Sequence, residues 1–315
     1  MNLQRISDIS IPEIISEQYD LGIFAAGFER RSNSVPLFLK PRNFKKVLVF
    51  GFIEEKDYES RENNNTYFLE NWAETIILVS ANDEGEIYTT LNNLDLNQQD
   101  SLKILIDYSS MSRLWYAGIL NWLKFNENYK NVIVDFCYSA GEYKNEVQPL
   151  FVEKIISIPG CEGSTQNFSK SVAIFGLGFD GSSTLWALDR LEPDIVFAYY
   201  ANPSIFPDYP ERTRRQNSEL LNEYASGILE IPLLSCESTF RYLGELISTY
   251  INNSDITIIP MGPKPHILSA ILLSFRFKEI TCLYINGKRE RTELINPTGH
   301  YAVSRVSFLK LNGKN

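Results

Sequence analysis

Three short motifs of this chain carry residues suited to anion binding, and each motif occurs twice. The first pair, GFERRS and GFDGSS, sets a glycine two residues before a carboxylate: Gly27 and Glu29, then Gly178 and Asp180. Glycine permits tight turns, and a carboxylate can accept ribose hydroxyls or act as a base. The alternative is structural: the glycines only shape turns, and the carboxylates form ion pairs with neighbouring arginines.

The second pair, DYESR and DYPERTRR, is rich in arginine. Arg212, Arg214 and Arg215 stand close together, whereas the first copy keeps only Arg61 opposite Arg212 and has Asn64 opposite Arg215. Planar guanidinium groups can clamp phosphate through paired hydrogen bonds. A solvated surface face is the alternative. If both copies bind a ligand, the second pocket should be the more basic.

The third pair, DYSSMSR and MGPKPH, follows an apolar run and opens a predicted helix. The second copy contributes Gly262, Lys264 and His266, and the first contributes Arg113. A lysine at a helix start is unfavourable to the helix dipole unless an anion is present, so this position indicates phosphate. A surface ion pair is the alternative for Arg113, and a non-catalytic role is the alternative for His266.

The three pairs keep one spacing, because 178 − 27, 208 − 57 and 264 − 113 all equal 151. That offset is close to half of the 315 residues and is too long for a solenoid repeat. The sequence therefore predicts an internal duplication into two domain-sized units.

Short apolar runs alternate with helical patterns in both halves, which predicts a parallel sheet covered on both faces. Strands are expected at 21–25, 46–52, 75–80, 102–107 and 132–138 in the first half, and in the run SVAIFGLGF and at 194–200, 229–235, 255–260 and 280–285 in the second. Helices are expected near 182–193, 238–252 and 265–276, with Ser182 or Ser183 as the cap of the first. The expected fold class is α/β, with two Rossmann-like units related by pseudo-twofold symmetry. Ligands of such sheets bind beyond the carboxyl ends of the strands, where all three motif pairs fall.

The expected domains are a first unit at 1–150, a linker at 151–170 that contains Pro, Gly and Ser, and a second unit at 171–315. The C-terminal GHYAVSRVSFLKL alternates between apolar and polar residues and is expected to add an edge strand.

Composition limits the classes of function. The formal net charge of −9 makes non-specific binding to duplex nucleic acid unexpected, although a local basic pocket would suit a small phosphorylated ligand. Two histidines and four scattered cysteines favour neither a His-rich metal site nor a disulfide framework. No transmembrane run and no secretory leader is visible, so a cytoplasmic protein without membrane contact is expected. No cofactor is indicated.

The stretch IIPMGPKPHILSAILLSF resembles the fourth-strand motif of CARF domains, which sense cyclic oligonucleotides in CRISPR-linked immunity. Gly262 and Lys264 match the family's Gly and Lys, while Pro263 stands where a hydroxyl residue is usual, and the first copy lacks the Gly. Two such units in one chain would be similar to a SAVED-type arrangement. The resemblance implies a nucleotide or cyclic oligonucleotide in a basic cleft between the halves, and a role in antiviral defence.

Three functions remain open. The first is a nucleotide-binding sensor or accessory subunit, with a protein partner encoded nearby as effector. The second is an enzyme acting on a nucleotide, of the ring-nuclease or glycosyl-transferring kind, in which Asp180, Arg212, Lys264 and His266 stabilise charge. The third is a structural subunit of a larger complex. The absence of a recognisable catalytic motif favours the first.

Overall fold

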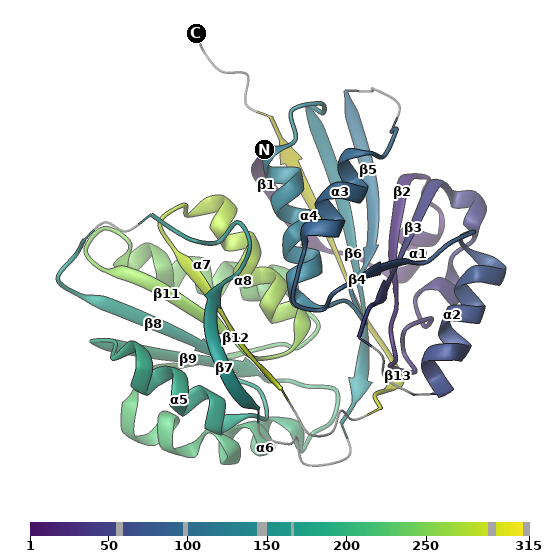
Figure 1. The fold of residues 1–315 in the computed structure, drawn as a ribbon. Coiled ribbons are helices and arrows are strands. Elements are labelled where there is room, and N and C mark those ends of the chain that lie inside the picture. The colour runs from purple at the N-terminus through teal and green to yellow at the C-terminus, as the bar shows by residue number, and fades with distance from the viewer. Residues whose placement is uncertain (55–58, 97–99, 144–149, 165–166, 289–293, 311–315) are drawn as a thin grey trace, which may run out of the picture. The chain divides into compact units, whose positions relative to one another are not determined.

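A computed structural model of the chain describes residues 1–54, 59–96, 100–143, 150–164, 167–288 and 294–310 (Figure 1). The protein is α/β, with two mixed sheets of mostly parallel strands and helices packed on them. It divides into a first unit, Met1–Glu142 with Leu294–Asn315, and a second unit, Tyr143–Glu293.

The first unit is built on the strand order β1-β13-β6-β5-β2-β3-β4. Strands β6, β5, β2, β3 and β4 run parallel to their neighbours, while β13 is antiparallel to β6 and β1 to β13. The strands are β1 (Asn2–Asp8), β2 (Tyr19–Ala26), β3 (Phe44–Phe52), β4 (Ile77–Val79), β5 (Ser101–Asp107), β6 (Asn131–Glu142) and β13 (Asn296–Leu309). The helices are α1 (Ile11–Ile15), α2 (Glu59–Asn71), α3 (Gly85–Asn92) and α4 (Arg113–Phe125), with short 3-10 turns η1 (Pro36–Phe38) and η2 (Pro41–Asn43).

Two apolar layers hold this unit together. On one face, Phe24 and Leu105 of the sheet pack in a buried cluster with Ile14 of α1 and Phe68 of α2. On the other face, the indole of Trp115 in α4 lies against the rings of Phe50 and Phe52. Strands buried on both faces explain the nearly continuous apolar runs of the sequence.

The second unit has the strand order β10-β9-β8-β11-β12-β7, in which only β7 is antiparallel among the described pairings. Helices α5 and α6 cover one face of this sheet, and α7 and α8 cover the other (Figure 1). The strands are β7 (Phe151–Ser157), β8 (Ser171–Gly176), β9 (Ile195–Ala201), β10 (Ala225–Ile231), β11 (Asp255–Pro260) and β12 (Thr281–Lys288). The helices are α5 (Gly181–Leu191), α6 (Tyr209–Gln216), α7 (Cys236–Tyr250) and α8 (Lys264–Arg276), with a π-helical turn η3 (Leu220–Tyr224).

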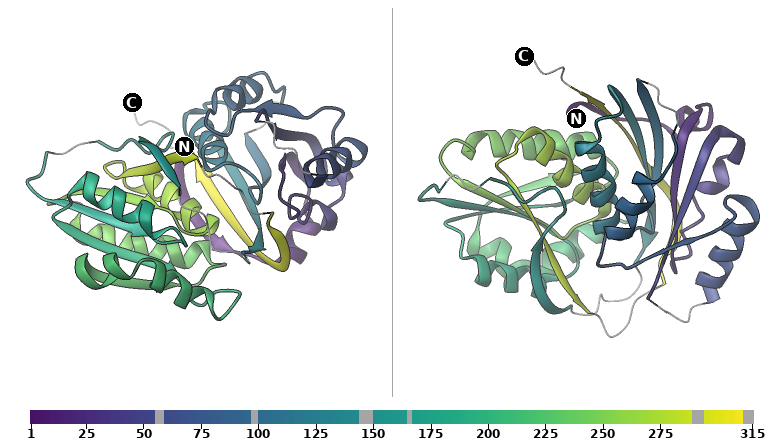
Figure 2. Two further views of the ribbon diagram at one scale, coloured as in Figure 1. Left: turned by 60° about the horizontal axis from the view of Figure 1, so that its bottom comes forward. Right: turned by 45° about the horizontal axis from the view of Figure 1, so that its top comes forward.

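The ends of each half differ from the expectation. Residues expected as a linker form β7, which pairs with β12 from Leu283↔Ser157 to Lys288↔Phe151. The C-terminal strand β13, expected at an edge of the second unit, lies inside the first sheet between β1 and β6. Figure 2 shows this yellow strand beside the teal β6. The physical reason is that alternating apolar residues specify a strand but not the strand with which it pairs.

Candidate functional site

The carboxyl ends of the parallel strands in the first unit carry a packed polar group, here called the first rim: 27–35 after β2, 108–112 after β5, and 138–142 of β6. A Cβ atom at Gly27 would lie 2.8 Å from the Cβ of Ser110, so only glycine allows the first two segments to approach this closely. The amide of Gly27 donates to Ser32 Oγ at 3.0 Å, and Ser32 Oγ donates to Ala25 O at 2.6 Å. The glycine's role is therefore a close approach between segments.

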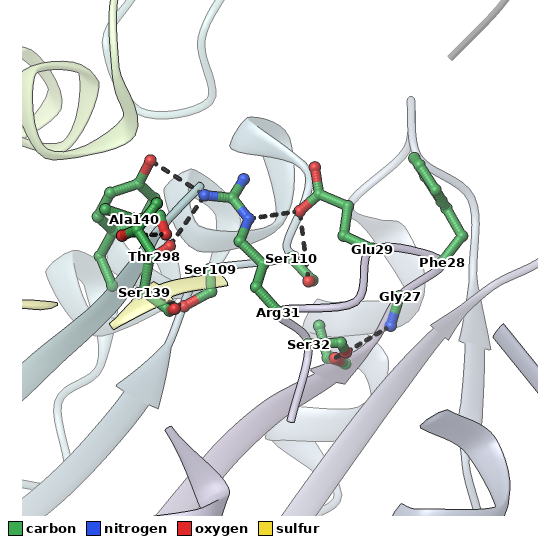
Figure 3. Close-up of polar contacts among 12 residues, drawn as sticks. Gly27, Phe28, Glu29, Arg31, Ser32, Ser109, Ser110, Ser139, Ala140 and Thr298 are labelled. Carbon is green, nitrogen blue, oxygen red and sulfur yellow. Dashed lines mark hydrogen bonds and ion pairs between the residues drawn. The ribbon is translucent and has the colours of Figure 1, made fainter. Parts of the chain in front are cut away.

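A fully buried arginine, which the sequence analysis treated only as an ion-pair partner, lies at the centre of the first rim (Figure 3). Arg31 is 1% exposed; its Nε donates to Glu29 Oε2 at 2.8 Å, and its Nη1 donates to Tyr138 OH at 3.0 Å and to Ser139 O at 2.9 Å. A buried charge needs such partners. Glu29 thus makes the ion pair that was the alternative to a ligand contact.

The serines of DYSSMSR connect strand ends. Ser109 Oγ donates to Asp107 Oδ1 at 2.5 Å and accepts the amide of Ser139 at 2.7 Å, which ties β5 to β6. Ser112 is the N-cap of α4, with its Oγ accepting the amide of Leu114 at 3.3 Å. Arg113 follows as the first residue of α4 and is half-buried.

Arg61 lies in α2, and its guanidinium donates to the carbonyls of Phe52 and Glu54 (the latter at 2.6 Å). It therefore closes the end of β3. Asn64, one turn further on, donates from Nδ2 to Gly27 O at 2.8 Å and to Glu29 O at 2.9 Å. Asp57 and Tyr58 of the DYESR motif lie outside the described residues.

The carboxyl ends of strands in the second unit carry another group of residues, here called the second rim: 177–180 after β8, 261–264 after β11, and helix α6. Two glycines make its centre, because a Cβ at Gly178 would lie 2.7 Å from Met261 O and a Cβ at Gly262 would lie 2.9 Å from Leu177 O. The amide of Met261 donates to Gly176 O at 2.8 Å. Neither glycine has a positive φ, so backbone contact explains both residues.

This contact predicts a loss of stability in the Gly178→Ala variant. Because the added methyl would meet a backbone oxygen, the two turns must separate, and we expect destabilisation of about 1–3 kcal/mol. Urea unfolding measures it. In the control Gly244→Ala, the new Cβ would lie 3.5 Å from Leu273 Cδ2 inside α7, so that variant should gain up to about 1 kcal/mol. Equal stabilities would contradict the close approach.

Asp180 is the N-cap of α5, where its Oδ1 accepts the amide of Ser183 at 3.2 Å and Ser182 Oγ at 3.0 Å. The expectation that Ser182 or Ser183 caps this helix is therefore wrong, and both serines instead donate hydrogen bonds to the Asp180 carboxylate. Asp180 suits this capping position, because a carboxylate accepts hydrogen bonds from first-turn amides and is stabilised by the helix dipole.

Arg212 lies over the face of Phe179, with its Cζ 4.1 Å from the ring centroid. Its Nη1 donates to Tyr143 O at 3.0 Å, and the ring of Phe179 also meets Tyr209 edge-on with centroids 5.2 Å apart. This places a guanidinium plane and an aromatic platform directly after Gly178. Arg214 is exposed on the same helix. Hydrogen bonds from Tyr200 and Asn202, with a smaller contribution from Arg214, hold the pKa of Glu230 below its usual value.

The start of α8 offers fewer amide donors than the sequence suggested. Pro263 and Pro265 have no amide hydrogen, and the amides of His266 and Ile267 both donate to Pro263 O, at 3.0 and 3.1 Å. An anion here would therefore rely on the Lys264 side chain and on the Lys264 amide more than on a set of helix amides.

His266 does not face solvent, because it is 1% exposed beneath the first turn of α8. Its Nε2 lies 3.1 Å from Pro232 O, a pure acceptor, so Nε2 carries the hydrogen. Nδ1 is buried without a hydrogen-bond partner. Burial lowers the pKa of His266 to about 4, opposed by the bond to Pro232. A buried neutral imidazole fits a structural role.

Of the predicted residues, Gly27 and Glu29 thus lie on the first rim, and Gly178, Asp180, Arg212, Arg214, Gly262 and Lys264 lie on the second; Arg113 begins α4 directly after the first rim. The structure directs Arg61 to backbone carbonyls and His266 into the core. Among the described residues, no cluster of three or more metal-ligating side chains occurs. None of the described helices has the length and apolar character needed to cross a bilayer. The chain matches no protein-family model, and a search of curated proteins finds no match.

Proposed function

We propose that the chain binds a nucleotide or a phosphorylated small molecule at the second rim and acts as a sensor or accessory subunit. The observation that supports this most is the stack of Arg212 on Phe179 beside the paired glycine turns that lead into Lys264. Guanidinium and ammonium groups bind phosphate, and an arginine–aromatic stack offers a flat surface to a base. The backbone of Gly178 lies against that of Met261, so the turn that carries Phe179 adjoins the turn that leads into Lys264.

We further propose that the two units are Rossmann-like copies of one ancestral unit. Both sheets share the order third-second-first-fourth-fifth for their parallel strands, from β4 to β6 and from β10 to β12. Both also share one contact: Asn64 donates to Gly27 O at 2.8 Å, and Asn217 donates to Gly178 O at 2.8 Å. The resemblance to CARF domains, the shared cleft and the role in antiviral defence stay predictions.

The rims favour binding over catalysis. Asp180 is engaged as a helix cap, and His266 is buried with a lowered pKa, so two of the four groups considered for catalysis are held in structural roles. The remaining two, Arg212 and Lys264, are cations that position and neutralise an anion without transferring a proton.

Isothermal titration with AMP, ATP and a cyclic oligoadenylate tests this proposal. We expect Lys264→Glu and Arg212→Glu each to weaken the tightest of these by tenfold or more, because each places a negative charge beside the phosphate. Lys278→Glu reverses an exposed charge beyond the far end of α8 and should leave binding unchanged. Mass spectrometry of the recovered ligand separates a binder from an enzyme.

Circular dichroism melts of each variant confirm that the fold is retained. Binding that is equal in all three variants and the wild type would overturn the assignment of the second rim, and turnover of the ligand would favour the enzymatic alternative.

A further inference from the structure

In each sheet the antiparallel strand beside the fifth parallel strand, here called the closing strand, comes from the other half of the sequence. Strand β7 follows β6 along the chain, and β13 follows β12. If each half closed its own sheet, β6 would pair with β7 and β12 with β13. The structure has the opposite arrangement, with β13 antiparallel to β6 and β7 antiparallel to β12.

The two closing strands occupy equivalent places. In each unit the closing strand runs antiparallel beside the fifth parallel strand and pairs with it along a ladder that has one irregularity. The ladder of β13 runs from Asn296↔Glu142 to Leu309↔Asn131 with one irregularity. We infer that the chain exchanges its closing strands between the halves, so that neither unit is complete alone and the two open as one cooperative body.

The first crossing leaves no slack in the chain. Glu142 pairs with Asn296 in the first sheet, and the very next residue, Tyr143, is held in the second unit. The Tyr143 amide donates to Tyr209 OH at 2.6 Å, and its carbonyl accepts Arg212 Nη1 at 3.0 Å. Separation of β6 from its sheet therefore displaces Tyr143, which is hydrogen-bonded to Tyr209 and Arg212 of the second rim.

The returning chain is anchored on the first rim. Lys288 pairs with Phe151 in the second sheet, and residues 289–293 lie outside the described part of the chain. Ile295 O then accepts the amide of Arg30 at 3.1 Å, and Thr298 Oγ1 donates to Ala140 O at 3.0 Å. Ile295 itself is 3% exposed, and a Cβ at Gly141 would lie 2.1 Å from its Cγ2. The start of β13 is thus packed into the loop that carries Arg31.

Both chain connections link the opening of one unit to the opening of the other. Opening the first unit releases β13, whose chain continues from β12, and it frees the end of β6, whose chain continues into β7. Opening the second unit releases β7 and with it the anchor at Tyr143. Opening of either unit takes its closing strand out of its ladder and exposes unpaired backbone groups, which is costly.

Hydrogen–deuterium exchange of the full-length protein tests this inference without a ligand. Two mild and matched core variants are used, Ile104→Val in β5 of the first unit and Ile258→Val in β11 of the second, both at fully buried positions. Removing one buried methylene should raise the opening equilibrium roughly two- to tenfold. We expect each variant to raise exchange by the same factor in peptides from both β5 and β11.

A variant that raises exchange only in its own unit would overturn the inference. A second measurement covers the case in which a variant folds poorly: the wild type in increasing urea. Peptides from β5 and β11 should reach their exchange midpoints at the same urea concentration, whereas two separate midpoints would also overturn it. Because neither readout involves a nucleotide, failure here leaves the proposed binding function untouched, and failure of binding leaves this inference untouched.

Discussion

Replacing Arg305 by alanine should destabilise the protein by about 3–5 kcal/mol. Its guanidinium makes a bidentate pair with Asp135, with both N–O distances at 2.7 Å, and Asp135 is fully buried. Tyr19 OH donates to the same carboxylate at 2.7 Å. Without Arg305 the buried carboxylate keeps one neutral donor and no opposite charge, which costs far more than the loss of an exposed pair. Urea unfolding measures the change.

The control for this variant is Lys130→Ala. Lys130 and Asp100 form a pair at 2.9 Å in the same unit, with side chains 59% and 73% exposed. Solvent screens that pair, so its loss should cost less than about 1 kcal/mol. The double variant Arg305→Met with Asp135→Asn should recover part of the loss, because it leaves no buried charge. If Arg305→Ala cost no more than Lys130→Ala, Arg305 would not stabilise the buried carboxylate of Asp135.

The order of elements could be predicted from the sequence because it depends on local patterns. Every expected parallel strand forms, since apolar runs buried on both faces have few other environments. Boundaries moved by a few residues, as in β10, which was expected at 229–235 and spans Ala225–Ile231. There the segment Leu220–Tyr224 forms a π-helical turn directly before the strand.

Strand partners could not be predicted, because pairing is a non-local choice. The alternating residues of β13 fit an antiparallel neighbour of either fifth strand, and specific contacts such as that of Arg305 with Asp135 distinguish the two. Sequence spacing alone does not show that these residues, 170 positions apart, face each other.

The contacts of the candidate site were also not predictable from sequence spacing alone. A constant offset of 151 set Asn64 opposite Arg215, whereas the shared contact with a glycine carbonyl pairs Asn64 with Asn217, at an offset of 217 − 64 = 153. If the proposed duplication holds, small insertions between motifs hide such matches. Arg31 was considered only as an ion-pair partner of Glu29. Its burial was not predicted, because its partners Tyr138 and Ser139 lie on a strand far along the chain.

The stability of the protein should fall as pH decreases from 7, and His266 should account for about 2 kcal/mol of the fall by pH 4.5. Burial holds the pKa of His266 at about 4 in the folded state, against a usual value of 6.5. As pH drops through 6.5 the unfolded chain takes up a proton that the folded chain does not, so unfolding is favoured. Below about pH 4 both states are protonated at this site, and the contribution becomes constant.

The measurement compares urea unfolding at pH 7 and pH 4.5 for the wild type and His266→Gln. The glutamine amide can still donate to Pro232 O but cannot titrate, so the variant should lose about 2 kcal/mol less between the two pH values, whatever its stability at pH 7. Other groups titrate in both proteins and cancel. His300→Gln, at an exposed position, should keep the wild-type pH dependence. If His266→Gln kept the wild-type pH dependence as well, the prediction would be contradicted: the pKa of His266 would not be lowered in the folded state, and its side chain would not be a buried neutral imidazole.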